Sequence, residues 1–349
     1  MEKNRRKKKS DRATITDVAK LAGVSKTTIS RFLSGQYHIL SESAMNRIQK
    51  AITELNYRPN KMARGLKRDC SYLIGMVIAD ITNPFSTAIL RGAEDVCKQR
   101  GYSLMVCNTD NDPAKEREYI FMLQSHRIDG LIINTTGHNN HFLQELAKER
   151  TAVVLVDRKV PELGFDTVTL DNEQAMAAGV NHLLGRGYEH IALFSEPIEG
   201  VSSRQERART FQNILSNHGV SAEVHEVDLR NLHDFSLKLD AFFRKAPKGK
   251  RAVFAANGVI LLKMIHLIQE KGIEIPNCVA VLGFDDMEWA PLIRPGITTL
   301  AQPTYEIGKT AMKRVLERID GDKSPAQNIA FSGQLIVRGS TPAVKEKRE

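Results

Sequence analysis

Small polar and basic side chains cluster in one short stretch near the N-terminus of the chain. Ser25, Lys26, Thr27, Thr28 and Arg31 fall within seven consecutive residues. Hydroxyl, ammonium and guanidinium groups donate hydrogen bonds to base edges and to phosphate oxygens. Residues of these types at this density predict a surface that reads nucleic acid.

Charge is distributed unevenly along the 349 residues. The first seventy residues hold 17 Lys and Arg against 6 Asp and Glu, whereas the other 279 hold 33 against 35. The formal net charge of +9 thus belongs to the N-terminal segment. Charge concentrated in one short segment indicates a polyanionic partner rather than a general aid to solubility, and nucleic acid is the first candidate.

The apolar pattern around the cluster predicts helices separated by a tight turn. Thr14 and Asp17 have the types and spacing of a capping pair, and apolar residues recur behind them at helical intervals. Gly23 is expected to end this first helix, and Ser25 to cap a second one. A third helix is expected over about 41–55, closing a small core with the side chains of Ile48, Ile52 and Leu55.

The second helix of such a unit enters the major groove with its N-terminal end, so side chains of its first turns reach base edges. Lys26, Thr27 and Arg31 are therefore the predicted readers of sequence. The hydroxyl groups beside them are expected nearer the backbone, where they and the helix-end amides bind phosphate. The predicted DNA-binding residues of this helix are Ser25, Lys26, Thr27, Thr28, Ser30 and Arg31.

Several motifs in this segment resemble the headpiece of the lactose/galactose repressor (LacI/GalR) family. They are Thr14-Ile15-Thr16-Asp17-Val18-Ala19, Ala22-Gly23-Val24-Ser25, Thr28-Ile29-Ser30-Arg31 and Leu55-Asn56-Tyr57-Arg58-Pro59-Asn60. The resemblance continues into Ala63-Arg64-Gly65-Leu66, which is similar to that family's hinge helix, a segment that orders when the protein binds its operator.

The resemblance implies that Leu66 enters the minor groove as a wedge beside Ala63, with Asn60 in the same DNA-binding set. The physical chemistry agrees, because an apolar side chain flanked by lysines and arginines suits a kinked, phosphate-lined minor groove. Gly65 disfavours a helix by about 1 kcal/mol, consistent with a segment that folds only on DNA. An ordinary basic linker is the alternative.

Beyond the headpiece, short apolar runs alternate with helical segments. Strands are expected over 73–78, 103–107, 130–133, 152–156, 191–194, 252–255 and 279–283. This alternation predicts an α/β architecture with two parallel sheets and helices on both faces. Ligands of open α/β sheets bind beyond the carboxyl ends of the strands, so polar residues directly after these runs are the candidate site.

The remaining motifs extend the family resemblance over nearly the whole chain and imply a two-lobed core like that of periplasmic binding proteins, with the effector between the lobes. They are Asp80-Ile81-Thr82-Asn83-Pro84-Phe85, Val156-Asp157-Arg158, Asp171-Asn172, Ala255-Ala256-Asn257, Gly283-Phe284-Asp285-Asp286 and Thr298-Thr299-Leu300-Ala301-Gln302-Pro303.

By that resemblance, Asn83 and Phe85 lie at the effector site, and Phe85 offers either a face for a sugar ring or a core side chain. Asn257 and Asp285 match the pair that fixes ligand hydroxyls. Arg207 stands where the family's Arg-x-x-Gly pattern has its effector-binding arginine, although Thr210 replaces the glycine three residues later. Two further candidates are Arg204, one helical turn earlier, and Trp289, which stacks on the ligand or packs within a lobe.

The expected charge of the effector follows from one departure from the family pattern. Gly258 follows Asn257 where the family commonly has aspartate, so one carboxylate near the cleft is absent. Arg158, Arg204 and Arg207, with Lys263 as a further candidate, would then form a basic constellation suited to a carboxylate or phosphate. This favours a sugar acid, or a sugar phosphate, over a neutral sugar. Surface ion pairs are the alternative for each arginine.

The domains expected are a disordered basic arm (1–12), a helix-turn-helix domain (13–58), a hinge (59–70) and a two-lobed effector and dimerisation domain (71–349). The arm's lysines would neutralise phosphates or simply meet solvent. Lobe 1 is expected over about 71–170 and 304–335, and lobe 2 over about 171–303 and 336–349. A homodimer on a near-palindromic operator is predicted, because one headpiece contacts few bases.

Other function classes lack their sequence signatures. The chain contains no nucleophile elbow, Walker loop or dinucleotide-binding glycine motif, so we expect no enzyme activity and no cofactor. The segment His138-Asn139-Asn140-His141 is interpreted as a solvated loop rather than a metal site. No apolar run suits a membrane span or signal peptide, and a cytoplasmic location is expected. An accessory DNA module on a sugar-processing enzyme is the remote alternative.

Overall fold

The computed structural model describes residues 13–58, 70–148, 151–247 and 250–344, and the chain divides into two compact units, Met1–Ser71 and Tyr72–Glu349. Each unit is described by itself. Among the described residues, no helix is long and apolar enough to cross a bilayer.

The first unit is a small helical headpiece. Its elements are α1 (Ile15–Ala22), α2 (Lys26–Leu33), the 3-10 turn η1 (Tyr37–Ile39) and α3 (Glu42–Glu54). Thr14 and Asp17 form a reciprocal capping box, and Gly23 ends α1 in the left-handed conformation with φ of 64°. The helix, turn and helix predicted from the sequence are confirmed, because local capping residues fix all three.

One apolar side chain from each helix meets at the centre of the headpiece. Val18, Ile29 and Ile48 are fully buried, from α1, α2 and α3 respectively. Helix α3 begins after Ser41, whose hydroxyl accepts from the amide of Ala44. The predicted third helix thus differs from the observed one only at its ends.

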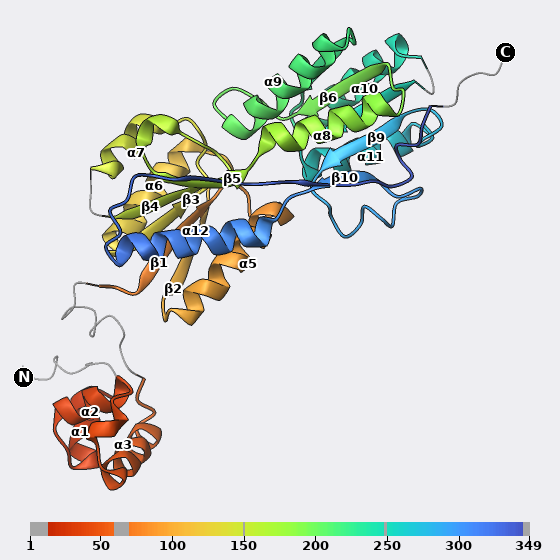
Figure 1. The fold of residues 1–349 in the computed structure, drawn as a ribbon. Helices are drawn as coiled ribbons and strands as arrows, with labels where there is room; N and C mark the ends of the chain where they lie inside the picture. Colours follow the sequence, from red (N-terminus) through yellow and green to blue (C-terminus); the bar gives the residue numbers. More distant parts are fainter. Residues whose placement is uncertain (1–12, 59–69, 149–150, 248–249, 345–349) are drawn as a thin grey trace, which may run out of the picture. The chain divides into compact units, whose positions relative to one another are not determined.

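The second unit contains two six-stranded sheets, one in each lobe (Figure 1). The lobe 1 sheet has the order β11-β5-β4-β3-β1-β2, and the lobe 2 sheet has the order β12-β10-β9-β8-β6-β7. All pairings are parallel except that of β12 with β10. In lobe 1, the strands are β1 (Leu73–Ile78), β2 (Ser103–Asn108), β3 (Gly130–Ile133), β4 (Ala152–Val156), β5 (Asp166–Leu170) and β11 (Asn328–Phe331). In lobe 2, they are β6 (His190–Ser195), β7 (Ala222–Glu226), β8 (Arg251–Ala255), β9 (Ala280–Phe284), β10 (Thr298–Ala301) and β12 (Gln334–Ile336).

Helices cover both faces of each sheet. Lobe 1 carries α5 (Pro84–Gln99), α6 (Pro113–Ser125), α7 (Asn140–Ala147), η2 (Pro161–Leu163) and α12 (Thr304–Ile319); lobe 2 carries α8 (Asn172–Gly185), α9 (Ser202–Asn217), α10 (Leu232–Lys245) and α11 (Gly258–Glu270). Apolar side chains fill both faces of each sheet. Gly92 and Gly308 let α5 and α12 touch, because a Cβ at either would collide with a backbone carbonyl of the other helix.

Within the described ranges, the chain crosses between the lobes three times, after β5, after β10 and after β11. The amide of Asp171 donates to the carbonyl of Phe331, which places two crossings side by side. All seven strands expected from the sequence are present. Sequence reasoning missed β5, β7, β10, β11 and β12, which are short and interrupted by polar residues, and it placed the end of lobe 1 at residue 335, inside β12 of the lobe 2 sheet.

Candidate DNA-binding surface and effector site

The predicted DNA-binding side chains of α2 share one face of the helix. Lys26 and Ser30 are four residues apart, as are Thr27 and Arg31, and all four are exposed. Ile29 points the opposite way into the headpiece core. No acidic residue lies in the first turn of α2, so its positive helix end is free to face an anion.

Two hydroxyls fix the start of this helix. Ser25 Oγ accepts from the amide of Thr28 at 3.1 Å and lies 2.8 Å from Thr28 Oγ1. Ser25 therefore acts first as the cap of α2, which orients the exposed residues behind it. The predicted DNA contacts at Asn60, Ala63 and Leu66, the hinge around them and the arm 1–12 lie outside the described residues.

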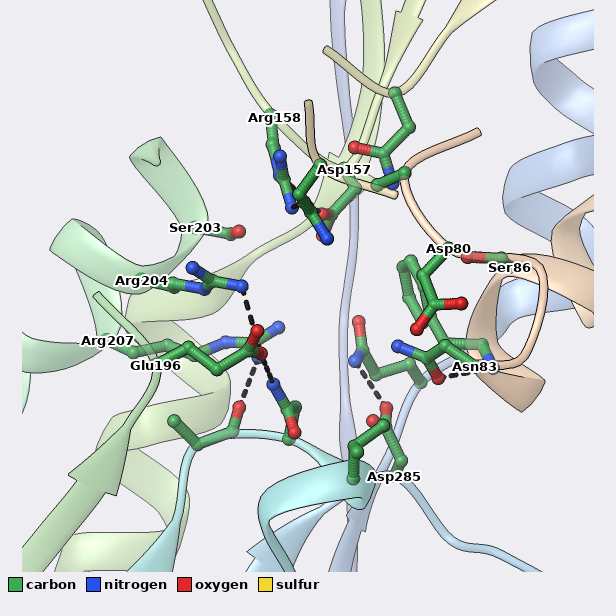
Figure 2. Close-up of a pocket in the computed structure, with 18 of the residues that line it drawn as sticks. Asp80, Asn83, Ser86, Asp157, Arg158, Glu196, Ser203, Arg204, Arg207 and Asp285 are labelled. Atoms are coloured by element: carbon green, nitrogen blue, oxygen red, sulfur yellow. Dashed lines mark hydrogen bonds and ion pairs between the residues drawn. The ribbon is translucent and has the colours of Figure 1, made fainter. Parts of the chain in front are cut away.

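The second unit has a pocket lined by residues from both lobes (Figure 2), with about 660 Å³ of empty space that includes open solvent. Most lining residues directly follow a strand or begin a helix, as expected for a site at the carboxyl ends of parallel strands. The lining residues are Ala79, Asp80, Asn83, Phe85, Ser86, Asn111, Asn134, Asp157, Arg158, Glu196, Ser203, Arg204, Arg207, Leu229, Ala256, Asn257, Val259, Asp285 and Gln302.

Arg207, on α9, is the most informative charge in the pocket. It is 5% exposed, and its guanidinium lies over the ring of Phe284, 3.9 Å from the centroid. Nε donates to Asn172 Oδ1 at 2.8 Å and Nη1 to the carbonyl of Ala256 at 2.6 Å. Burial lowers the pKa of Arg207, and within the described part of the chain no carboxylate forms an ion pair with it. Its bonding partners are neutral acceptors.

Arg158 follows β4 in lobe 1 and is 6% exposed. Nη1 donates to the carbonyl of Thr135 at 2.7 Å, and Nη2 donates to Asn111 Oδ1 at 2.9 Å. Its Nε lies 3.8 Å from Asp157 Oδ2 and has no hydrogen-bond partner among the described residues. Burial lowers the pKa of Arg158 as well.

Arg204 has a carboxylate partner at hydrogen-bond distance, closer than the 3.8 Å pair of Arg158 with Asp157. Its Nη2 lies 2.9 Å from Glu196 Oε2, and its Nη1 donates to the carbonyl of Pro197 at 2.8 Å. The same Glu196 oxygen accepts from Asn257 Nδ2 at 2.7 Å. Asn257 in turn caps α11, with its Oδ1 accepting from the amide of Ile260.

Asp285, directly after β9, is 5% exposed and has a left-handed backbone with φ of 70°. Its carboxylate accepts from the amide of Gly258 at 2.8 Å and from Gln302 Nε2 at 2.6 Å. Burial raises the pKa of Asp285, although Arg207 and the two donors oppose that rise. The structure therefore holds a buried carboxylate that also lines the pocket.

Asn83 and Phe85 line the lobe 1 side of the pocket. Asn83 caps α5 through a 3.0 Å bond from the amide of Phe85, and Phe85 is 8% exposed within the apolar cluster of lobe 1. Phe85 thus belongs both to the core and to the pocket wall, so the two interpretations left open by the sequence are compatible.

Several pocket residues were missed by the site prediction. Asp80, Asn134 and Glu196 were not selected, yet Asn134 directly follows β3 and Glu196 directly follows β6. The rule that polar residues after strands form the site would have found both. Asn134 Oδ1 and Gln302 Oε1 are buried without a hydrogen-bond partner among the described residues, which marks them as acceptors available to a ligand.

Three expectations need correction. Trp289 does not line the pocket and packs against the apolar cluster beside α10 and α11, because the turn after β9 directs it into lobe 2. Lys263 lies within α11 and does not line the pocket. The lining is also not basic overall, because four carboxylates accompany its three guanidinium groups.

The segment 138–141, interpreted from the sequence as a solvated loop, is exposed except at Asn139, and its last two residues begin α7. Asn139 is 7% exposed and donates from Nδ2 to Glu116 Oε2 at 2.6 Å, and Glu116 also accepts from the amide and hydroxyl of Thr136. Gly137 packs against Gly200 of lobe 2, where a Cβ would collide with the carbonyl. No group of three or more metal-ligating side chains occurs in the described ranges.

A second lobe-to-lobe contact connects with Arg207. The amide of Lys159 in lobe 1 donates to Ser202 Oγ of α9 at 2.7 Å, and Lys159 Nζ lies 2.8 Å from Glu206 Oε1. Glu206 Oε2 accepts from Asn172 Nδ2 at 3.0 Å, and Asn172 is the residue that holds Arg207 Nε. The lobe interface and the buried arginine therefore share one bonded chain.

The sequence also matches proteins already characterised. The family profile for bacterial regulatory proteins of the lacI family matches residues 14–60, and the profile for a periplasmic binding protein-like domain matches residues 180–341. The chain is 48% identical over 337 residues to the HTH-type transcriptional regulator KdgR of Bacillus subtilis, covering 96% of this chain and 99% of that protein. The chain belongs to the LacI family of bacterial regulatory proteins.

Further similarities cover the same extent of this LacI-family chain. It is 44% identical over 331 residues to the HTH-type transcriptional regulator PtxS of Pseudomonas aeruginosa, covering 95% of this chain and 96% of that protein. The lac repressor dimer bound to operator and the anti-inducer ONPF has the same fold, with a TM-score of 0.83 and 23% identity over 95% of this chain and 100% of that one. The chain is a DNA-binding transcriptional regulator.

Proposed function

We propose that this regulator represses genes of carbohydrate catabolism and releases a near-palindromic operator, bound as a homodimer, when a sugar acid binds between its lobes. The headpiece supplies the exposed face of α2 for base contacts. The pocket supplies charged, amide and aromatic side chains for a small polar effector.

The main evidence for an acidic effector is the set of hydrogen bonds that Arg207 makes. Among the described residues, the hydrogen-bond partners of Arg207 are neutral acceptors, and the carboxylates of Asp157 and Asp285 act on its charge only through space. Burial of a charge without a directly paired anion costs several kcal/mol. A carboxylate in the adjoining pocket would pair with Arg207 and offset that cost. A neutral sugar would leave the charge as it is.

The rest of the pocket suits hydroxyl groups. Figure 2 shows Arg204 and Arg207 on one side of the pocket, with Asp80, Asn83 and Asp285 on the other. Carboxylates accept from hydroxyls, and amides both donate and accept. The two sides together match a molecule with an acidic group at one end and a polyhydroxyl chain at the other.

The charge count favours a carboxylate over a phosphate. Four carboxylates line the pocket. A phosphomonoester carries a charge of about −1.5 to −2 at neutral pH, whereas a sugar acid carries a single negative charge. Repulsion from the lining is therefore larger for the sugar phosphate, and the described lining residues include three arginines to compensate it.

The chain of contacts from Arg207 to Lys159 supports coupling between effector and lobes. An effector that changes the position of Arg207 acts through Asn172 and Glu206 on the ion pair with Lys159. The lobes can then favour different relative angles with and without effector, and differential affinity for these states shifts the DNA-binding equilibrium.

The test begins by selecting high-affinity duplexes from a random library with the purified full-length chain. Operator binding is then measured by fluorescence anisotropy while gluconate, 2-keto-3-deoxygluconate, gluconate 6-phosphate and the neutral glucitol are added. We expect two-fold symmetric operators, release by at least one sugar acid, and no release by glucitol. Arg207→Met should abolish release, whereas the matched control Arg209→Met, exposed on the same helix, should retain it.

The other outcomes separate the alternatives. Release by glucitol alone would contradict the acidic effector, and release only by the phosphate would favour a sugar-phosphate sensor. Tighter operator binding with a sugar acid would reverse the sign and make the acid a corepressor. Conversion of an added sugar to a product would indicate an enzyme.

A further inference from the structure

Glu196 holds two of the pocket's candidate donors for an effector. Its Oε2 lies 2.9 Å from Arg204 Nη2 and accepts from Asn257 Nδ2 at 2.7 Å. In Figure 2 a dashed line joins its carboxylate, in the loop after β6, to Arg204. Two donors that line the pocket, one of them a helical turn before Arg207 on α9, thus bind a carboxylate of the protein itself.

We propose that Glu196 is a resident competitor of the effector: its carboxylate occupies Arg204 and Asn257, and the acidic group of the effector displaces it. Glu196 thereby sets the affinity of the site for acids and excludes weakly binding ones. This inference rests on the proposed function, because it requires a sugar acid in this pocket.

The position of Glu196 makes displacement feasible. Its side chain is 22% exposed and that of Arg204 is 14% exposed, so the pair is accessible at the pocket wall, unlike Asp285 deep in the site. Glu196 follows β6 in a loop and caps no helix. Two carboxylates cannot share one pair of donors without strong repulsion, so the effector and Glu196 compete.

A second role for Glu196 makes the opposite prediction. A carboxylate that accepts from effector hydroxyls, or that holds Arg204 in its binding position, would help binding. Removal of its charge would then weaken every ligand, with the acid and its neutral analogue affected alike. The sign of the change therefore separates competitor from helper.

The test is isothermal titration of the full-length chain with gluconate and with glucitol, which share a carbon skeleton and differ in charge. Glu196→Gln keeps the shape of the side chain and removes its charge. We expect Glu196→Gln to bind gluconate roughly tenfold more tightly than the parent chain, with no gain for glucitol, because a like charge is removed from the site. Glu199→Gln, an exposed change of the same type in the same loop, should leave both affinities unchanged.

A double variant tests whether Glu196 acts through Arg204. Arg204→Met should weaken gluconate binding. Adding Glu196→Gln to Arg204→Met should raise gluconate affinity by much less than tenfold, because the donor that Glu196 occupies is no longer present. Equal gains in both backgrounds would contradict action through Arg204. Thermal melting of each variant checks that the fold is kept.

The remaining outcomes are distinguishable. Gluconate binding to the parent chain without a gain in Glu196→Gln would overturn the competitor role and leave the proposed function standing. No gluconate binding to either chain at millimolar concentration would overturn both the competitor role and the use of this pocket for such acids.

Discussion

The headpiece and the effector pocket obtain their functional side chains in opposite ways. In the headpiece, the candidate DNA contacts of α2 are consecutive or one turn apart, exposed, and oriented by the cap at Ser25. In the pocket, Arg158, Arg207 and Asp285 are buried, and the lining comes from distant parts of the chain. Arg207 bonds to Asn172, 35 positions away, and to Ala256, 49 positions away.

This difference separates local from long-range specification. Capping and helical periodicity act over three or four residues, so the geometry of α2 follows from its own sequence. The charge state and orientation of Arg207 depend on which acceptors the folded lobes bring to it. Perturbing one region should therefore leave the other largely intact, and each of the following changes tests that separation.

The largest expected effect is on the effector unit. Asp166 is 2% exposed; Arg318 donates to it at 2.6 and 3.1 Å, and Arg314 Nε lies 3.1 Å away. Asp166→Asn should cost about 3–5 kcal/mol, because it leaves two arginines without their buried partner. Urea unfolding followed by segment-resolved hydrogen exchange should show a loss of stability in lobe 1 and no loss of stability in the headpiece. Asp320→Asn, which breaks an exposed pair with Arg100, is the control.

The effect of Asp166→Asn should also depend on pH. Burial alone would raise the pKa of Asp166, but bonds from Arg318, the amide of Gln327 and Arg314 hold that pKa below its usual value. A lowered folded-state pKa contributes stability that is complete above the unfolded value of about 3.9 and is lost as pH falls through the folded value. The two chains should thus differ most near neutral pH and converge in acid. A constant difference down to pH 2 would contradict this account.

A substitution in the headpiece core tests the separation of the two units from the other side. Ile48 is fully buried, and Ile48→Ala should cost about 2–5 kcal/mol, enough to unfold much of so small a unit. Operator affinity should collapse while titration with an effector gives an unchanged dissociation constant. Gln49→Ala, exposed on the same helix, should preserve both. A parallel loss of effector binding in Ile48→Ala would show that the two units are not separable.

The smallest expected change affects sequence preference rather than folding. Exchanging Lys26 and Thr27, as Lys26→Thr with Thr27→Lys, keeps the net charge of the exposed face. Preference at the bases they contact should change by about 1–3 kcal/mol, while the slope of affinity against salt concentration stays the same. Competition binding on operator variants measures this. Uniform weakening on every duplex would instead assign both residues to phosphate contacts.

Elements specified by local sequence were predicted better than elements that depend on long-range pairing. The headpiece helices were predicted from Thr14, Gly23 and Ser25, because a cap and a left-handed glycine act within one turn. The seven apolar strands were visible as runs of buried residues. Strands such as β7, whose five residues include two glutamates and a histidine, were not, since their stability comes from pairing with β6.

Some contacts at the pocket could not be predicted from the sequence. The resemblance to the LacI family supplied Arg207, Asn257 and Asp285, and all three line the site. Neither the resemblance nor the spacing indicated that Glu196 would bond to Arg204, or that Trp289 would turn into lobe 2. These outcomes depend on the positions at which separate strands end.

The sequence by itself determined that the N-terminal segment is a basic helix-turn-helix followed by an α/β body, because charge, capping and apolar periodicity are local properties. Only the tertiary structure decided the electrostatics of the effector site. It gave Arg207 neutral partners, gave Arg204 a carboxylate, and joined Arg207 to the lobe contact at Lys159. The physical reason is that the energy of a buried charge depends on every group that surrounds it, and those groups meet only when the chain folds.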